Sequence, residues 1–187
     1  WGTYYGGNAH EAGEACATDA FGNVYLVGHT SSTVGISASG AYQSHLVGVV
    51  NAFIAKFNPN GQRQWATYYG SDSNAEACVI DNLGNIIIAG SLGYTGIFNM
   101  ASAGSHQATP GGNADAFLAK FNSAGQRIWG TYYGGPGYDE CYSCAVDCSG
   151  NIFLSGHTEL ASTTNTNVFA TPNAFQTVYA GGNYDGF

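Results

Sequence analysis

The sequence predicts an all-β protein built from β-propeller blades of four antiparallel strands each. Three observations predict this fold: a glycine-rich composition with little charge, a sequence repeat, and short segments that are apolar on both faces. The 187 residues include 28 Gly and are 44% hydrophobic, 14% aromatic and only 9% charged, whereas an average soluble domain is about 25% charged. Frequent Gly and scarce Lys and Glu disfavour long helices, and the aromatic content disfavours disorder.

The repeat has a period of about 64 residues and contains three blocks in a fixed order. The first block, Trp-x-Thr-Tyr-Tyr-Gly, begins at Trp1, Trp65 and Trp129. The second, Asp-x-x-Gly-Asn, begins at Asp19, Asp81 and Asp147. The third begins at Asn51 and Asp115 and starts once more at Asp185, just before the chain stops. We therefore treat residues 1–187 as one partial β-propeller with repeats starting at 1, 65 and 129.

Each period is expected to contain four strands. In the first period they are Glu14–Asp19, Asn23–Thr30, Ala52–Asn58 and Arg63–Tyr69. The innermost strand carries small apolar residues on both sides, which indicates that both of its faces are covered. Its turn, Asp-x-x-Gly-Asn, suits an Asp that bonds to backbone N–H groups ahead of it and a Gly with positive φ. The innermost strands of the next two periods are expected to begin near Glu76 and Tyr142.

Strands covered on both faces describe a sheet that lies between two other sheets, as a propeller blade does. A linear stack of sheets, as in a β-solenoid, is the alternative, but the long period and the loop of about 20 residues suit a propeller better. We expect the chain to open on a fourth strand, run through two full blades and stop inside a third strand. Propellers have roughly 4–8 blades, so the remainder of its own propeller or a second copy is needed to close the ring. The missing initiator Met and signal peptide favour a fragment of a longer chain.

The same blocks resemble the bacterial SBBP family, the seven-bladed β-propeller repeat. Residues Trp129 to Thr158 and Thr171 to Phe187 match its pattern best. The middle repeat departs from the pattern at Gly90–Gly93, and the third carries about six extra residues around Glu159 to Val168. The resemblance implies a bacterial exported or cell-surface protein, and it supplies no catalytic residues.

Composition and charge narrow the function classes. The net charge is −8, from 12 acidic and 4 basic residues. This argues against nucleic acid, which requires a stripe of Lys and Arg, and against an anionic membrane surface. No apolar run approaches the roughly 18 residues of a membrane span. Low charge favours a secreted or cell-surface location.

Cysteines, histidines and carboxylates could carry chemistry, and each has a structural explanation that we prefer. Cys16, Cys78 and Cys144 are repeat-equivalent and are expected to be buried, unbonded thiols between blades. Cys141 and Cys144 should face opposite sides of a strand, and Cys148 lies at its far end, which disfavours a zinc or redox site.

The histidines and the acidic residues also have structural explanations. His29 and His157 are expected to be polar strand ends that bond to the adjacent loop. Asp139 and Glu140 form an acidic pair expected on the loop that enters the third blade, where a solvated loop is preferred over Ca²⁺ binding or glycoside hydrolysis.

The sequence thus predicts a non-catalytic structural or interaction module of an exported bacterial protein. A carbohydrate-binding propeller is the alternative. No catalytic, cofactor-binding or metal-binding residue is assigned, and no cofactor is expected. The expected partners are another protein or a surface glycan. An enzyme with its active site at the central channel is disfavoured, because the innermost strands carry mainly Ala, Cys, Val, Ile and Thr.

Overall fold

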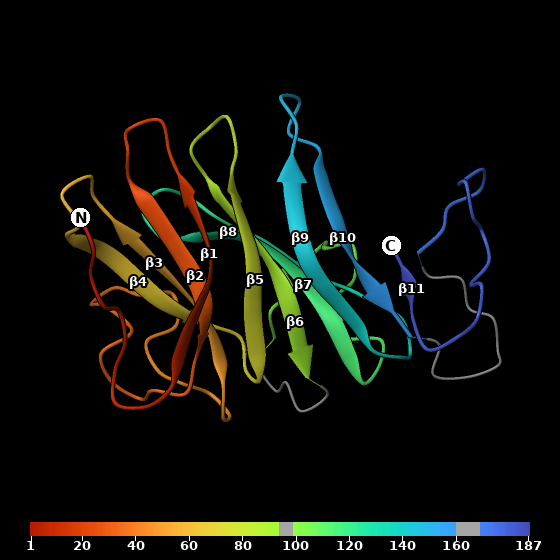
Figure 1. The fold of residues 1–187 in the computed structure, drawn as a ribbon, viewed down its shortest axis with the longest axis horizontal. Helices are drawn as coiled ribbons and strands as arrows, with labels where there is room; N and C mark the ends of the chain where they lie inside the picture. Colours follow the sequence, from red (N-terminus) through yellow and green to blue (C-terminus); the bar gives the residue numbers. More distant parts are fainter. Residues whose placement is uncertain (94–98, 160–168) are drawn as a thin grey trace.

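The structure is a computed structural model that describes residues 1–93, 99–159 and 169–187. These residues form eleven strands and no helix. They form three sheets that fan out side by side (Figure 1). Blade 1 contains β1 (Glu11–Thr18), β2 (Val24–Thr30), β3 (Asn51–Phe57) and β4 (Arg63–Tyr69). Blade 2 contains β5 (Ser73–Ile80), β6 (Ile86–Gly93), β7 (Ala114–Phe121) and β8 (Arg127–Tyr133). Blade 3 contains β9 (Asp139–Val146), β10 (Ile152–Thr158) and β11 (Asp185–Gly186).

Within each sheet the strands follow the order of the chain, and neighbours pair antiparallel. The innermost strands β1, β5 and β9 lie next to one another and run in the same direction (Figure 1). The three sheets do not close into a ring. The all-β prediction and the prediction of antiparallel blades are confirmed, as is the end of the chain inside a third strand. No helix capable of crossing a membrane occurs among residues 1–93, 99–159 and 169–187.

The turn between the first and second strands of a blade is held by its aspartate. In blade 1, Asp19 Oδ1 accepts hydrogen bonds from the backbone N–H groups of Phe21 and Asn23, both at 3.0 Å. Gly22 has φ of 78°, a left-handed conformation that favours glycine. Asp81 and Asp147 make the same pair of bonds in blades 2 and 3. The role predicted for these aspartates is confirmed.

The core of the molecule consists of apolar layers between blades. One layer joins Ile54 and Tyr25 of blade 1 to Ile86, Ile88 and other residues of blade 2. A second layer joins blade 2 to blade 3, with Ile87 and Leu118 on one side and Cys141 and Cys144 on the other. Blade 2 is therefore covered on both faces, which explains why its strands β6 and β7 are almost fully buried.

A repeated aromatic pair locks each blade to the next. The second Tyr of the Trp-x-Thr-Tyr-Tyr block packs against a Phe in the third strand of the following blade, or directly after it in blade 3. The three pairs are Tyr5–Phe53, Tyr69–Phe117 and Tyr133–Phe187, with ring centroids 5.2, 5.6 and 5.7 Å apart. Each sequence repeat therefore begins one strand before its structural blade, because the fourth strand of one blade packs against the blade that follows.

Two expectations about strands need correction, and a third falls mostly on residues that the structure does not describe. The opening segment, Trp1 to Gly7, is not a strand, since no neighbouring strand pairs with it, although Tyr5 occupies its expected packing slot. The innermost strands begin three residues earlier than predicted, at Glu11, Ser73 and Asp139. Most of the insertion around Glu159 to Val168 lies outside the described residues.

Candidate functional site

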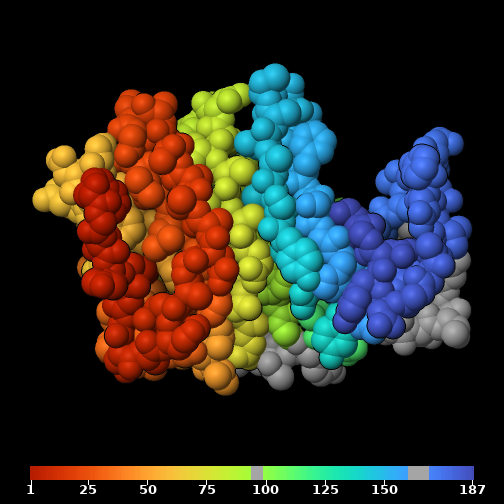
Figure 2. Space-filling model, viewed as in Figure 1, coloured from red at the N-terminus to blue at the C-terminus, as the bar shows by residue number. Residues whose placement is uncertain are grey.

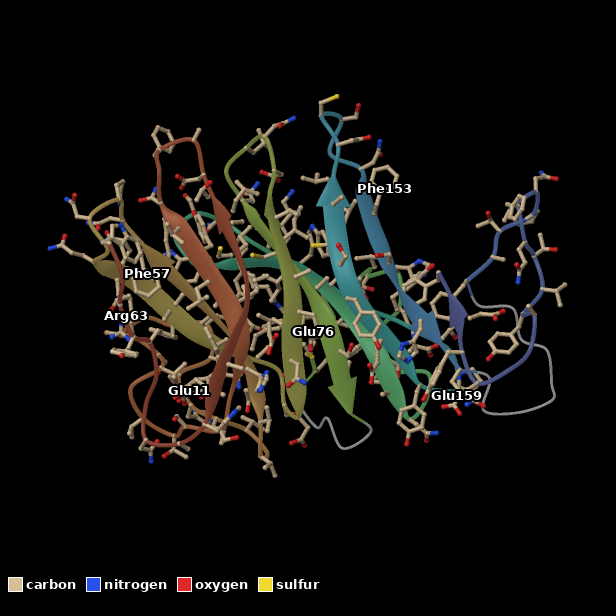
Figure 3. The ribbon with its side chains drawn as sticks, in the orientation of Figure 1. Glu11, Phe57, Arg63, Glu76, Phe153 and Glu159 are labelled. Atoms are coloured by element: carbon tan, nitrogen blue, oxygen red, sulfur yellow. The ribbon has the colours of Figure 1, made fainter. Side chains whose placement is uncertain are left out.

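Polar side chains of the innermost strands recur at one repeated bulge. In β1 the pairing with β2 skips one residue between Gly13 and Ala15, which leaves Glu14 as the extra residue. The extra residue of β5 is Glu76, and that of β9 is Tyr142. We call the surface formed by Glu14, Glu76, Glu140 and Tyr142 the inner face. Figure 3 shows Glu76 projecting from β5, between β1 and β9.

A glycine of the second strand permits each bulge. A Cβ atom on Gly28 would collide with the carbonyl oxygen of Ala12, and a Cβ on Gly90 with that of Asn74. Gly156 has the same relation to Glu140. Only glycine fits where two backbones approach this closely. The recurring Gly in the second strand is therefore the sequence signal that marks the bulge.

The inner face is negatively charged. Burial, and then the neighbouring charges of Glu14 and Glu140, raise the pKa of Glu76 above its usual range. His29 lies beside this surface, with its Nδ1 3.4 Å from Glu14 Oε1. The ring of His29 also stacks on that of His10, with centroids 5.6 Å apart.

Blade 3 presents an aromatic cluster at the same position. The Tyr142 hydroxyl donates to Glu140 Oε2 at 3.0 Å and lies 2.6 Å from His157 Nδ1. The ring of Tyr184 packs on His157, with centroids 4.2 Å apart. Burial, followed by the hydrogen bond to Glu140, raises the pKa of Tyr142 to about 12. Because Tyr142 and Tyr184 are each more than half exposed, this cluster is available to a ligand.

The predicted roles of two histidines and two carboxylates are corrected. His29 and His157 contact the bulge residues Glu14 and Tyr142 instead of bonding to an adjacent loop. Asp139 and Glu140 belong to strand β9 and not to the loop before it. Asp139 is fully buried, whereas Glu140 lies on the inner face. Alternation along the strand separates the two side chains.

All five cysteines are free thiols. Cys78 and Cys144 are buried between blades as predicted, but Cys16 is exposed, because its side of blade 1 has no blade against it in the structure. Cys141 and Cys144 share the buried face of β9, contrary to the prediction, since the bulge at Tyr142 shifts the alternation by one residue. Cys148 lies in the exposed turn.

The basic residues serve the turns and the blade contacts. Lys120 Nζ lies 2.7 Å from Asp81 Oδ2, and Lys56 Nζ lies 3.9 Å from Asp19 Oδ2. Lys56 also lies over the ring of Tyr25, 5.0 Å from its centroid. Arg63 and Arg127 donate to the carbonyl oxygens of Ile36 and Met100. The two lysines therefore pair with turn acids, and the two arginines bond to backbone carbonyls.

Sequence reasoning missed a pair of buried carboxylates, Asp115 and Asp139, at the junction of blades 2 and 3. Comparison of the repeats could have found it. Asp115 stands where the previous repeat has Asn51, and Asp139 stands where it has Ser73. Both substitutions add a negative charge at the same junction.

The comparison with protein families identifies the repeat. Residues 128–159, which span β8, β9 and β10, match the model of the SBBP family, described as a beta-propeller repeat. This segment of the chain is therefore similar to the SBBP beta-propeller repeat. The matched segment begins on the outer strand of blade 2 and ends with the second strand of blade 3, so the SBBP unit has the same one-strand offset as the aromatic pairs. A comparison with curated proteins found no match.

Proposed function

We propose that this chain is a non-catalytic structural or interaction module of an exported bacterial protein, with the inner face as its partner surface. One observation carries the proposal. The polar residues that recur in every repeat are used in turns and blade contacts, whereas the inner face varies from Glu14 and Glu76 to Tyr142. A surface that differs between equivalent blades suits recognition of an asymmetric partner.

The partner surface is tested by binding. The variant Glu14→Gln with Glu76→Gln removes charge from the inner face, and Gln64→Ala, at an exposed position of the outer strand β4, is the control. Both proteins are screened with the unchanged chain against charged peptides and a glycan array. We expect the inner-face variant alone to lose binding. Conversion of a bound ligand to a product would refute the proposal that the module is non-catalytic. Equal binding by all three proteins would refute the proposal that the inner face is the partner surface.

Glycan recognition is the second candidate, and the exposed cluster of Tyr142, His157 and Tyr184 favours it. Aromatic rings beside a carboxylate offer a sugar both an apolar face and a hydrogen-bond acceptor. Tyr184→Ala and Tyr142→Phe should then each weaken binding to the same glycans. The charge variant Glu14→Gln should have little effect on a sugar, so the two candidates give different results on one array.

Export is supported by the low content of charged residues, 9% of the chain. Fractionation of cells that produce the full-length protein, with detection by an antibody against this chain, tests the location. Recovery in the medium or at the surface supports the proposal, and recovery in the cytosol contradicts it.

We further propose that blade 3 packs against another blade, from the same propeller or from a second copy. Phe153 of β10 is 57% exposed, whereas its repeat equivalents Tyr25 and Ile87 are fully buried. A groove of about 490 Å³ lies beside it, lined by Ile152, Leu154, Phe187 and other residues. Figure 2 shows this hollow between β10 and the segment near residues 170–180. Light scattering at increasing concentration distinguishes a dimer from a monomer, and Phe153→Glu should abolish a dimer.

A further inference from the structure

The junction between blades 2 and 3 brings two buried carboxylates together. Asp115, near the start of β7, is 1% exposed, and Asp139, the first residue of β9, is 0% exposed. A Cβ on Gly134 would collide with Asp115 Oδ1 and would lie 3.0 Å from Asp139 Oδ2. The two side chains therefore converge on one glycine from two different blades.

The equivalent junction between blades 1 and 2 is neutral. Its counterparts are Asn51 and Ser73, which are also buried. Asn51 Nδ2 donates to the carbonyl oxygen of Gly70, and Ser73 Oγ donates to that of Tyr69 at 2.9 Å. Ionised Asp115 and Asp139 have no proton to donate. The junction between blades 2 and 3 therefore lacks the hydrogen-bond donors that the side chains of Asn51 and Ser73 supply between blades 1 and 2.

The carboxylate oxygens of the charged junction are only partly satisfied. Asp115 accepts hydrogen bonds from Gly111 N and Gly112 N, at 2.9 and 3.1 Å. Asp139 Oδ2 accepts one from Gly135 N at 2.6 Å, and the Thr158 side chain lies beside the Asp139 carboxyl group. Asp139 Oδ1 is nevertheless buried, and no described residue makes a hydrogen bond of normal geometry to it. A buried acceptor without a partner is costly. Together with the two neighbouring carboxylates, this oxygen indicates a ligand-binding site.

More oxygens surround the same glycines. A Cβ on Gly111 would lie 2.6 Å from the carbonyl oxygen of Gly135 and 2.9 Å from that of Gly134. The protein's own Lys and Arg side chains are engaged elsewhere. Their partners are Asp19 for Lys56, Asp81 for Lys120, Gly35 O for Arg63 and Met100 O for Arg127. His157 is the remaining basic side chain close enough to affect the pKa of Asp139, and it contacts Tyr142.

We propose that Asp115 and Asp139 bind a divalent cation between blades 2 and 3, and that Ca²⁺ is the ion that fits best. Ca²⁺ prefers carboxylate and carbonyl oxygens and tolerates irregular geometry. Its two charges balance those of the two carboxylates, and it supplies the partner that Asp139 Oδ1 lacks. Carbonyl oxygens of the turn at residues 134–136, together with water, would complete the coordination. The ion would tie β7 of one blade to β9 of the next.

The test uses the whole chain after treatment with a chelator. Terbium(III) serves as a luminescent probe for Ca²⁺, and thermal unfolding is followed by circular dichroism. We expect terbium luminescence that Ca²⁺ displaces, with a Kd of about 10⁻⁴–10⁻³ M, in the range of extracellular calcium modules. The melting temperature should rise by several degrees at about 10 mM Ca²⁺.

Asp115→Asn with Asp139→Ser copies the neutral junction and should abolish both effects. Asp115→Asn alone is a milder variant, because it keeps the bond from Gly135 N to Asp139, and it should weaken terbium binding at least tenfold. Glu14→Gln with Glu76→Gln is the control for the acidic inner face and should retain both effects.

Four results would overturn the proposal: no Ca²⁺ effect on the unchanged chain, an unchanged effect in the Asp115 and Asp139 variants, an equal rise with NaCl of the same ionic strength, or stabilisation by mild acid in place of Ca²⁺. The last result would mean that the two carboxyl groups share a proton.

Discussion

Asp81 illustrates how one residue closes a turn and ties it to the third strand of its blade. Its carboxylate accepts bonds from Leu83 N and Asn85 N at 2.9 Å and lies 2.7 Å from Lys120 Nζ. Burial alone would raise the pKa of Asp81, but the bonds from Asn85, Lys120 and the backbone outweigh it and lower the pKa to about 2. A folded-state pKa below the unfolded value means that the charged form stabilises the fold.

We therefore predict that Asp81→Asn lowers the free energy of unfolding by about 2 kcal/mol at pH 7. In the unchanged protein this contribution is present above the unfolded pKa and is lost as the pH falls through the folded pKa of about 2. The difference between variant and parent should thus shrink from pH 5 to pH 2, as measured by urea unfolding. Asp147→Asn, in the exposed turn of blade 3, is the control and should cost less. A difference that does not depend on pH would contradict this account.

The five cysteines should divide into two reactivity classes. Cys16 and Cys148 are exposed, whereas burial raises the pKa of Cys78 and Cys144 to about 12 and that of Cys141 to about 11. Because the thiolate is the reactive form, a thiol reagent should modify two cysteines in the native protein at pH 8. All five should react in denaturant. Mass spectrometry of the labelled peptides checks the assignment, and rapid native labelling of Cys78 would show that the contact between blades 1 and 2 opens.

Residue roles within a local turn were predictable from the sequence. Roles that depend on which face of a strand a side chain occupies were not. The turn aspartates follow from Asp-x-x-Gly-Asn, since each bonds to its own neighbours. The faces of Cys141 and Cys144 could not be predicted from strict alternation, because the bulge at Tyr142 inserts one residue between them. The convergence of Asp115 and Asp139 depends on two blades meeting, which no local pattern reports.

At the scale of elements, the outer strand of each blade acts mainly through the blade that follows. Trp65 of β4 donates from Nε1 to the carbonyl oxygen of Ser123 at 3.0 Å. A Cβ on Gly125 would lie 2.8 Å from the indole Cδ2, so the ring lies directly on the β7–β8 turn. Trp65 and Trp129 are half-buried.

We predict that Trp65→Ala destabilises the fold by about 2–3 kcal/mol, less than a fully enclosed aromatic because part of the ring is already exposed. Denaturant unfolding measures the loss. Trp1→Ala is the matched control: Trp1 makes the equivalent bond to Pro59 O but is 64% exposed, so its removal should cost less. Unchanged stability of Trp65→Ala, together with loss of glycan binding, would instead favour a sugar site at this ring.

The strand order and the four-stranded blade were predictable because the repeat fixes the length and the hydrophobic pattern of each element. The outer strands β4 and β8 were predicted to the residue. The inner strands were predicted too short, since their first residues Glu11, Ser73 and Asp139 are polar. Each of these polar residues accepts or donates a hydrogen bond at the entrance to its blade, as Glu11 does with Gly7 N at 3.1 Å.

At the scale of the whole molecule, the blades differ in how much of their surface other blades cover. Blade 2 lies between the other two and is packed on both faces. One face of blade 1 is covered by the opening segment, through Trp1 and Tyr5, and by Ile36 and Leu46 of the loop between β2 and β3. Blade 3 has one packed face, and its third strand β11 pairs over only two residues.

This arrangement predicts a gradient of local stability, because backbone opening is easiest where few buried apolar contacts hold a strand. In hydrogen–deuterium exchange, β6 and β7 should be the last strands to exchange, β2 and β3 should follow, and β10 and β11 should exchange first. If another blade or a second copy covers blade 3, its addition should slow exchange in β10 and leave β6 unchanged. Uniform protection in all three blades of the isolated chain would contradict the gradient, because it would mean that the blades open only as one cooperative unit.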